Sequence, residues 1–173
     1  MSSSSTNKQP LLVDRPLHEW ALLGSVPALI DPLNLSSPLA AGCVELVNCM
    51  DNDGAIVDSL SVIANQANTS EVKLIAFLST SPSSQGISSL NTAAVASAAV
   101  LSAAAGQRTN VSLPPLSVPV PNLGGMASPG ETDKKGTGLY VPKGQVLYVG
   151  LDKQITLPTP INIINVFAQG GYF

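Results

Sequence analysis

His18 is the only histidine in the chain, so any Ser–His or Cys–His nucleophilic site would have to use it. The residues around it do not resemble a nucleophile elbow, and a proline-rich segment is not a rigid support for a catalytic group. We therefore interpret His18 as a surface or interface residue. The sequence predicts a protein that is not an enzyme and has no catalytic residues.

Two cysteines, Cys43 and Cys49, are the other side chains with reactive chemistry. On one extended strand they would lie about 20 Å apart, which is too far for a disulfide, although a tight bend between them would change this. We expect two reduced, half-buried thiols. One histidine and two cysteines also do not supply the paired ligands of a zinc site.

The segment Asp51-Asn-Asp-Gly54 has the composition of a calcium-binding loop. The EF-hand frame, however, places Cys49 at the first ligand position and Leu60 at the twelfth, where a bidentate Glu is required. The same residues are typical of a turn, because Asn and Asp tolerate left-handed geometry and Gly has no Cβ. We predict a turn here, and neither a metal site nor a cofactor.

The composition indicates a folded chain with an unusually uncharged surface. Of the 173 residues, 11% are charged and 45% are hydrophobic, the reverse of a disordered chain. Such a surface suits a protein that is covered by identical copies or by a larger partner. The eight Lys and Arg are scattered and the net charge is −3, which argues against nucleic-acid binding. No apolar run is long enough to cross a membrane, and the absence of a signal-peptide pattern predicts synthesis in the cytoplasm.

Residues 1–40 are predicted to form an extended N-terminal arm. Their prolines exclude long helices and central strands, whereas apolar residues such as Leu11 and Trp20 make the segment too hydrophobic for an exposed linker. The arm either packs along its own domain or lies on a neighbouring subunit. The two interpretations are compatible.

From about residue 42 the hydrophobic pattern has the period of two that β-strands require. Residues 42–50 and 55–64, joined by the predicted turn, are expected to pair as a hairpin. Residues 72–78, 145–151 and 161–168 are further strands. The inward-facing positions of the first three segments are predicted to be Val44, Leu46, Met50, Ile56, Leu60, Val62, Val72, Leu74, Ala76 and Leu78. This rhythm of short strands predicts an all-β sandwich or barrel over residues 41–173.

Residues 92–105 contain eight alanines and would be helical by propensity alone. A turn at 106–110 and a proline-rich extended stretch follow them, so we interpret the segment as a strand, with helix as the alternative. Residues 79–91 are predicted to be a loop. Residues 122–138 form a longer polar loop, of the kind that is usually functional or mobile.

Two stretches near the C-terminus carry a resemblance: Gly138-Leu-Tyr-Val-Pro-Lys-Gly-Gln-Val-Leu-Tyr-Val-Gly-Leu151 and Pro160-Ile-Asn-Ile-Ile-Asn-Val-Phe-Ala-Gln-Gly-Gly-Tyr-Phe173. They resemble the ends of small head proteins of tailed bacteriophages, which include proteins of cyanophage-like podoviruses. The N-terminal arm, the strand rhythm from Gly42 and Val111-Ser-Leu-Pro-Pro are similar to the same family, so the resemblance covers most of the chain.

The resemblance implies a jelly-roll-like antiparallel β-sandwich with an extended N-terminal arm. It further implies a capsid decoration (cement) protein, a structural virion protein that binds the outside of the shell and stabilises it. The implied partners are the major capsid protein and further copies of this chain in a homotrimer, and the implied location is the capsid exterior, after synthesis in the host cytoplasm. The family brings no catalytic residues, and residues 92–105 fit its pattern least well.

Candidate anchors of such an interface are the aromatic, arginine and aliphatic residues of the arm and the C-terminus, because these types dominate protein interfaces. They are Leu11, Leu12, Val13, Arg15, Leu17, Trp20, Tyr172 and Phe173. Packing within their own chain is an equally good interpretation. If the arm is the anchor, deletion of residues 1–20 should abolish capsid binding and leave the sandwich folded.

The alternative function is a carbohydrate- or receptor-binding β-sandwich of a viral head fibre or spike. Sugar sites usually present exposed aromatic residues, and the chain has one Trp, three Tyr and three Phe. This scarcity argues against the alternative, and a glycan array would distinguish the two functions.

Overall fold

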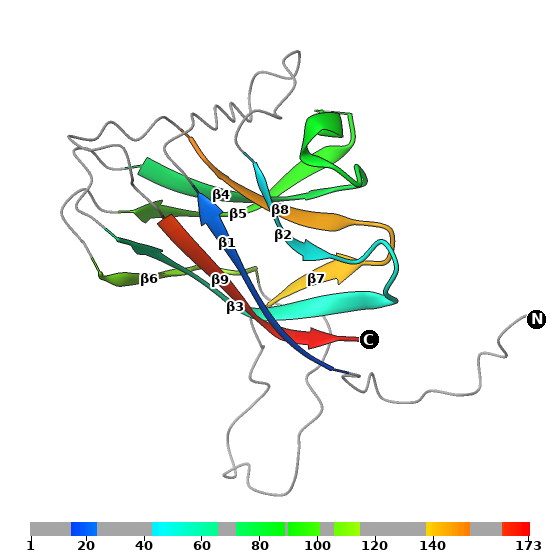
Figure 1. Ribbon diagram of the computed structural model, residues 1–173, viewed down its shortest axis with the longest axis horizontal. Helices are drawn as coiled ribbons and strands as arrows, with labels where there is room; N and C mark the ends of the chain where they lie inside the picture. Colours follow the sequence, from blue (N-terminus) through cyan, green and yellow to red (C-terminus); the bar gives the residue numbers. More distant parts are fainter. Residues whose placement is uncertain are drawn as a thin grey trace, which may run out of the picture.

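In the computed structural model, the chain forms a sandwich of two antiparallel β-sheets (Figure 1). The structure describes residues 15–23, 43–65, 72–88, 90–100, 106–114, 138–152 and 164–173, and only the backbone of residues 97–100. The strands in these ranges are β1 (Arg15–Leu23), β2 (Val44–Asn48), β3 (Gly54–Ala64), β4 (Val72–Ser79), β5 (Thr92–Val100), β6 (Arg108–Val111), β7 (Leu139–Pro142), β8 (Val146–Leu151) and β9 (Ile164–Tyr172). A short 3₁₀ helix, η2 (Ser84–Gly86), precedes β5. The prediction of an all-β sandwich is confirmed.

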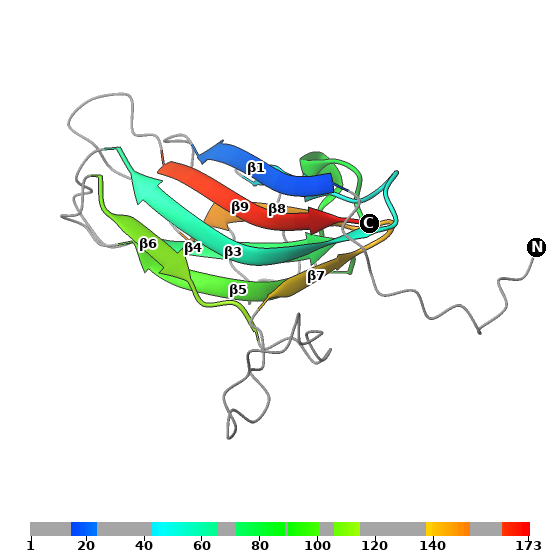
Figure 2. The ribbon, with the colours of Figure 1, turned by 90° about the horizontal axis from the view of Figure 1, so that it is seen from below.

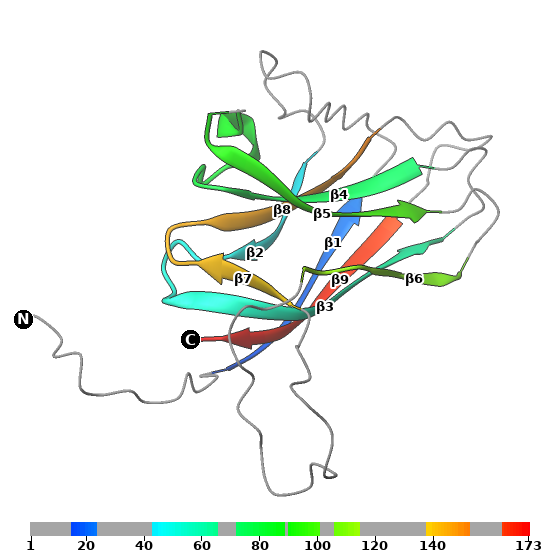
Figure 3. The same cartoon turned by 180° about the vertical axis from the view of Figure 1, so that it is seen from behind.

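The first sheet has the strand order β1-β9-β3-β6, and β7 pairs with β3 beyond the end of β6. The second sheet has the order β2-β8-β4-β5 (Figure 3). Figure 2 shows β1, β9 and β3 on one side of the molecule and β4 and β5 on the other. At the sides of the sandwich, β1 lies near β2 and β5 lies near β6. The two sheets thus enclose one core.

That core consists of the inward-facing residues of both sheets, together with buried residues such as Phe77 and Tyr148 on the other face of the second sheet. Its largest fully buried side chains include Tyr148, Phe77, Leu17 and Leu74. The hydroxyl of Tyr148 donates a hydrogen bond to the carbonyl oxygen of Ser81 (3.0 Å), so the polar end of this buried aromatic ring is satisfied. Strands β4 and β8 are buried along most of their length, which explains their nearly continuous runs of apolar residues.

The predicted hairpin of residues 42–50 and 55–64 is wrong. Strand β2 pairs with β8 in the second sheet, whereas β3 pairs with β9, β6 and β7 in the first. The turn at residues 51–53 therefore carries the chain from one sheet to the other. The turn after β7 also crosses between the sheets, and the Nζ atom of Lys143 in that turn lies 2.8 Å from Oδ1 of Asp53 in the first.

At the N-terminal end of β3, the residues that face the core are not the predicted ones. Ala55 and Val57 are fully buried, whereas Ile56 is only partly buried. The pairing with β9 shifts between Val57 and Ser59, so Asp58 lies in a β-bulge. A bulge adds one residue and reverses which residues face the core. Leu60 and Val62, beyond the bulge, are buried as predicted.

Residues 92–100 form strand β5, which confirms the strand interpretation for that part of the alanine-rich segment. Residues 101–105 lie outside the described ranges, as do residues 122–137 of the predicted polar loop. In β4, Val72, Leu74 and Ala76 are buried as predicted, and Phe77 joins them on the opposite face. Strand β9 continues to Tyr172, four residues further than the predicted strand.

Residues 15–23 of the predicted arm form the edge strand β1 of the first sheet, which is the alternative in which the arm packs along its own domain. All nine of its residues pair with β9, from Arg15 opposite Tyr172 to Leu23 opposite Ile164. Pro16 is compatible with this position because an edge strand leaves one side without strand partners. The rest of residues 1–40 lies outside the described ranges.

Candidate interaction surface

The first sheet presents one face to the core and the other away from the second sheet. We call the face that points away from the second sheet the outer face. Its members follow from the alternation of side chains along each strand and from the pairing registers. They are Pro16, His18, Trp20, Leu22, Ile56, Ser59, Ser61, Ile63, Arg108, Asn110, Tyr140, Asn165, Phe167 and Gln169.

Apolar side chains cluster on the outer face over β1, β9 and β3. Trp20 is directly opposite Phe167, and Leu22 and Ile63 lie in the adjacent row, on either side of Asn165. Directly opposed Cβ atoms lie about 5 Å apart and diagonal ones about 7 Å, so these four side chains form one patch. Trp20 is 60% exposed and Leu22 is 42% exposed, while Phe167 and Ile63 are partly buried. Tyr140, at 46% exposure, adds a second aromatic residue near β7.

Charged side chains are scarce around this apolar patch. The residues in the neighbouring rows of β1, β9 and β3 are His18, Gln169, Asn165 and serines, and Arg108 on β6 lies directly opposite Ile63. Arg108 is thus at the β6 edge of the patch, and Asp58 lies further along β3. An exposed Trp beside aliphatic residues, with an Arg at one edge, is typical of the composition of a protein interface.

The predicted anchors divide into buried and exposed residues. Leu17 (2% exposed) and Tyr172 (5% exposed) are part of this chain's own core, which is the alternative of packing within the chain. They face inward because they share the phase of Ala21 and Ile164, which also line the core. Trp20 is exposed, and Leu11, Leu12 and Val13 lie outside the described residues.

Arg15 and Tyr172 join the start of β1 to the end of β9. The guanidinium carbon of Arg15 lies 4.4 Å from the centre of the Tyr172 ring. The Tyr172 hydroxyl donates a hydrogen bond to Oε1 of Glu19 (2.9 Å). Burial, and then this carboxylate, raise the pKa of Tyr172. Phe173 is partly buried, and its backbone N–H donates to the carbonyl oxygen of Gly54 (3.0 Å). These contacts stabilise the edge of the sandwich.

The sequence interpretation did not single out Leu22, Ile63 or Phe167. A signal was present in β9. Asn165 and Gln169 take the outward positions of this strand, and Phe167 lies between them in the same phase. A large aromatic residue in the polar phase of a strand faces away from the core, and that position is unusual enough to indicate a contact.

The two cysteines are buried thiols and form no disulfide, as predicted, although they are more deeply buried than expected. Burial raises the pKa of each thiol from 9.0 to about 11, and the nearby Arg15 lowers that of Cys49 only partly. The thiolate is the nucleophilic form, so burial makes both thiols less nucleophilic at neutral pH.

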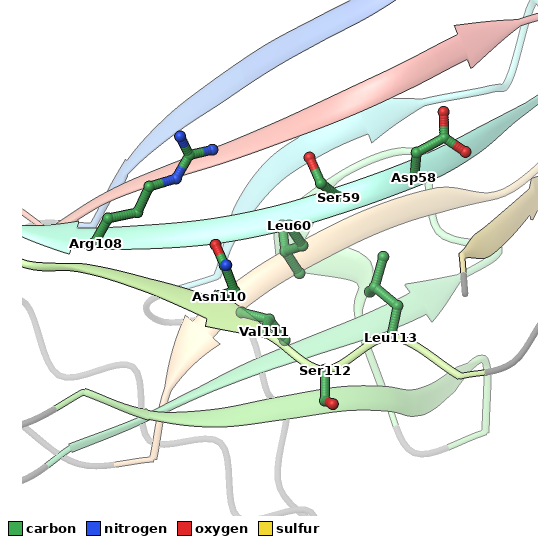
Figure 4. A pocket seen from close by; sticks show the side chains of 8 residues that line it. All are labelled: Asp58, Ser59, Leu60, Arg108, Asn110, Val111, Ser112 and Leu113. Carbon is green, nitrogen blue, oxygen red and sulfur yellow. The ribbon is translucent and has the colours of Figure 1, made fainter. Parts of the chain in front are cut away.

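A shallow groove of about 530 Å³ lies between β3 and the residues that follow β6 (Figure 4). Its floor consists of Leu60, Val111 and Leu113, which are apolar and largely buried. Asp58 and Arg108 lie at its opposite ends, and Ser59, Asn110 and Ser112 complete the lining. A volume of this size is sufficient for a small ligand or a few side chains.

Within the described ranges, no three His, Cys, Asp or Glu residues are grouped closely enough to hold a metal ion. The same ranges contain no helix with the length and hydropathy needed to span a membrane. Comparisons of the chain with protein-family models, with curated proteins and with solved structures find no match.

Proposed function

We propose that this chain is a structural, non-catalytic virion protein that binds the outer surface of a tailed-virus capsid and stabilises the shell. In this role, a capsid decoration (cement) protein, it contacts the major capsid protein and self-associates, with a homotrimer as the proposed state. The observation that carries the proposal is the outer face, where Trp20, Leu22, Ile63 and Phe167 form an apolar patch with Arg108 at its β6 edge.

The patch supports an attachment role on energetic grounds. Burial of apolar area contributes about 25 cal/mol per Å², and Trp is among the residues that contribute most at interfaces. One patch of this size gives a modest affinity. Repeated contacts in an oligomer on a symmetric shell raise the effective affinity by about 10²–10⁴-fold. A protein without a catalytic group can stabilise a shell in this way.

The connection of the strands supports the finer assignment to a jelly-roll-like sandwich. The chain crosses repeatedly between the sheets, with β1, β3, β6, β7 and β9 in one and β2, β4, β5 and β8 in the other. Double-sheet jelly rolls of eight strands occur in viral capsid and lectin domains. This is an analogy of fold, and the function rests on the outer face.

Co-sedimentation with empty heads of the source virus tests the proposal. The purified chain is first characterised by size exclusion with light scattering, and then mixed with heads over a range of concentrations. We expect binding that saturates at a fixed number of copies per shell. A chain that stays in the supernatant at every concentration would contradict the capsid role.

Carbohydrate binding is the second candidate, favoured by the surroundings of Trp20. Its exposed ring lies next to the row of His18 and Gln169, which offers hydrogen-bonding groups beside an aromatic surface. A glycan array separates the two functions. Glycan binding that is lost in Trp20→Ala, together with no binding to heads, would favour the carbohydrate function.

A further inference from the structure

The groove beside β3 lies where the pairing along one edge of β3 is interrupted between two partner strands. Strand β6 pairs with residues 60–63 of β3, and β7 pairs with residues 54–57 on the same side. The two residues between, Asp58 and Ser59, have no strand partner there, and the chain after Val111 diverges from β3. The backbone N–H of Gly138 donates to the carbonyl oxygen of Pro114 (3.0 Å) and closes the base of this divergence. The groove is therefore part of the fold.

The ends of the groove carry opposite charges, and neither has a partner among the described residues. In the described part of the chain, no hydrogen bond or ion pair involves the side chain of Asp58 or Arg108. Arg108 is opposite Ile63, five residues beyond Asp58 on β3. At about 3.3 Å per residue, the two charges are roughly 17 Å apart along the strand. The groove thus combines an acidic end, an apolar floor and a basic end.

One segment of the sequence has the complementary order of properties. Lys8 is followed by the apolar run Leu11-Leu-Val13 and then by Asp14. In an extended conformation Lys8 and Asp14 are roughly 20 Å apart, which is close to the spacing of Asp58 and Arg108. Lys8 can therefore face Asp58 while Asp14 faces Arg108, with Leu11–Val13 over the apolar floor.

A chain cannot place its own segment in its own groove in this orientation. Arg15 lies across β9 from Ala55, which is eight residues from Ile63 along β3. Strand β1 is also three strands away from β6. The positions of Arg15 and Arg108 are consequently roughly 30 Å apart. Asp14 is adjacent to Arg15 in the sequence, so it cannot reach Arg108 of the same chain. The reverse orientation would bring like charges together.

We propose that the groove between Asp58 and Arg108 binds the segment Lys8–Asp14 of a second copy of this chain. Each copy then donates one segment and accepts one. Such a head-to-tail contact forms a ring where the rotation between copies closes, and an open filament where it does not. The homotrimer of the proposed function is one such ring. The inference names the contact behind the self-association in the proposed function, and its test does not involve the capsid.

Charge reversal tests this contact in the full-length chain. One variant changes the groove (Asp58→Lys with Arg108→Glu), a second changes the segment (Lys8→Glu with Asp14→Lys), and a third combines all four substitutions. The readout is the concentration at which the oligomer half-dissociates, measured by sedimentation velocity. Circular dichroism and thermal melting show whether each variant is folded.

We expect each double variant to raise the half-dissociation concentration by about tenfold or more, because attraction is replaced by repulsion at two pairs. The fourfold variant should return to the wild-type value. Unchanged assembly of the groove variant, a folded fourfold variant that does not recover, or a wild-type chain that is monomeric at all concentrations would each overturn the proposal. Neutral substitutions, Asp58→Asn with Arg108→Gln, provide a second test with less effect on folding and should weaken assembly by a smaller factor.

Sedimentation with heads separates this inference from the proposed function. If the groove variant still binds heads but no longer self-associates, the segment contact stands and is distinct from the capsid contact. If the wild type self-associates through the groove and does not bind heads, the proposed capsid role is wrong while the segment contact stands.

Discussion

Gly170 of β9 lies so close to the backbone of β3 that a Cβ atom at this position would overlap the carbonyl oxygen of Ile56. The contact is at the bulge around Asp58, where β3 approaches β9 closely. Because the obstacle is backbone, a side chain cannot move aside to relieve it. The absence of a Cβ at position 170 therefore permits the bulge.

Gly170→Ala should lower the free energy of unfolding by about 2–3 kcal/mol, the range of overpacked core substitutions. Denaturation with urea, followed by circular dichroism, measures the change. Gly106→Asn is a matched control, because a Cβ at residue 106 meets no atom within 4 Å and Asn tolerates its positive φ of 73°. Loss of stability in the control that equals that of Gly170→Ala would remove the steric explanation.

Truncation should distinguish the segment before β1 from β1 itself. Deletion of residues 1–14 leaves every described residue in place, so the sandwich should fold and melt cooperatively. Deletion of residues 1–20 removes the buried Leu17 and most of β1, and exposes the edge of β9. We expect aggregation or a broad, low-temperature melt for the longer deletion. Equal melting curves would show that β1 contributes little to the fold.

The apolar patch on the outer face should be required for attachment to the shell. Trp20→Ser with Leu22→Ser should weaken co-sedimentation with heads by about 2 kcal/mol or more, the usual cost at an interface hot spot, and should leave the melting temperature nearly unchanged. Leu90→Ser is the control, because Leu90 is 97% exposed and lies outside the outer face. Equal effects of the two changes would mean that the patch has no special role.

Ser61 should tolerate loss of its hydroxyl. It is 1% exposed, and its Oγ atom has no hydrogen-bond partner among the residues that the structure describes. Burial of an unsatisfied hydroxyl costs about 1–3 kcal/mol, so Ser61→Ala should be neutral or stabilising. Ser81→Ala provides the contrast, since the Ser81 hydroxyl donates a hydrogen bond to the carbonyl oxygen of Ser83 (2.8 Å). Loss of this bond should lower the free energy of unfolding by about 1 kcal/mol. A Ser61→Ala variant less stable than Ser81→Ala would indicate a hidden partner of Ser61.

Stability should decrease as the pH rises above about 9. Burial raises the pKa of both thiols from 9.0 to about 11, so between these values the folded state retains protons that the unfolded state releases. Tyr148, whose pKa rises from 10.0 to about 12 mainly through burial, continues the trend. The contribution is therefore fully present below pH 9 and is lost as the pH passes 11. Urea denaturation between pH 7 and 11 measures the slope, which should be shallower in the variant with Cys43→Ala and Cys49→Ala.

The all-β class and most strands could be predicted because the alternation of apolar residues is local. Which strands pair could not be predicted by the same means. Residues 44–48 and 54–64 are adjacent in sequence with a good turn between them, yet their partners are about 100 residues away in β8 and β9. Only the burial of both sheets against each other selects these pairings.

The candidate site was predictable only in part, for a related reason. Trp and Leu are residue types that suit a core or an interface equally well. The phase of β1 decides whether Trp20 and Leu17 face the core or solvent. That phase depends on the register with β9, which places Leu17 over Gly170 on the core side and Trp20 opposite Phe167 on the outer face. Likewise, the bulge at Asp58 reverses the phase of Ile56 without a signal in β3 itself.

The hydrogen bond between Gly138 and Pro114 has a practical consequence for display of foreign sequences. It holds two points of the chain, 24 positions apart in the sequence, at a donor–acceptor distance of 3.0 Å. A cargo domain whose own termini are close together could replace the residues between these points without separating β6 or β7 from β3. The entropic cost of such an insertion grows only slowly with its length. On a decorated shell, every copy of the chain would then carry one cargo at an identical position.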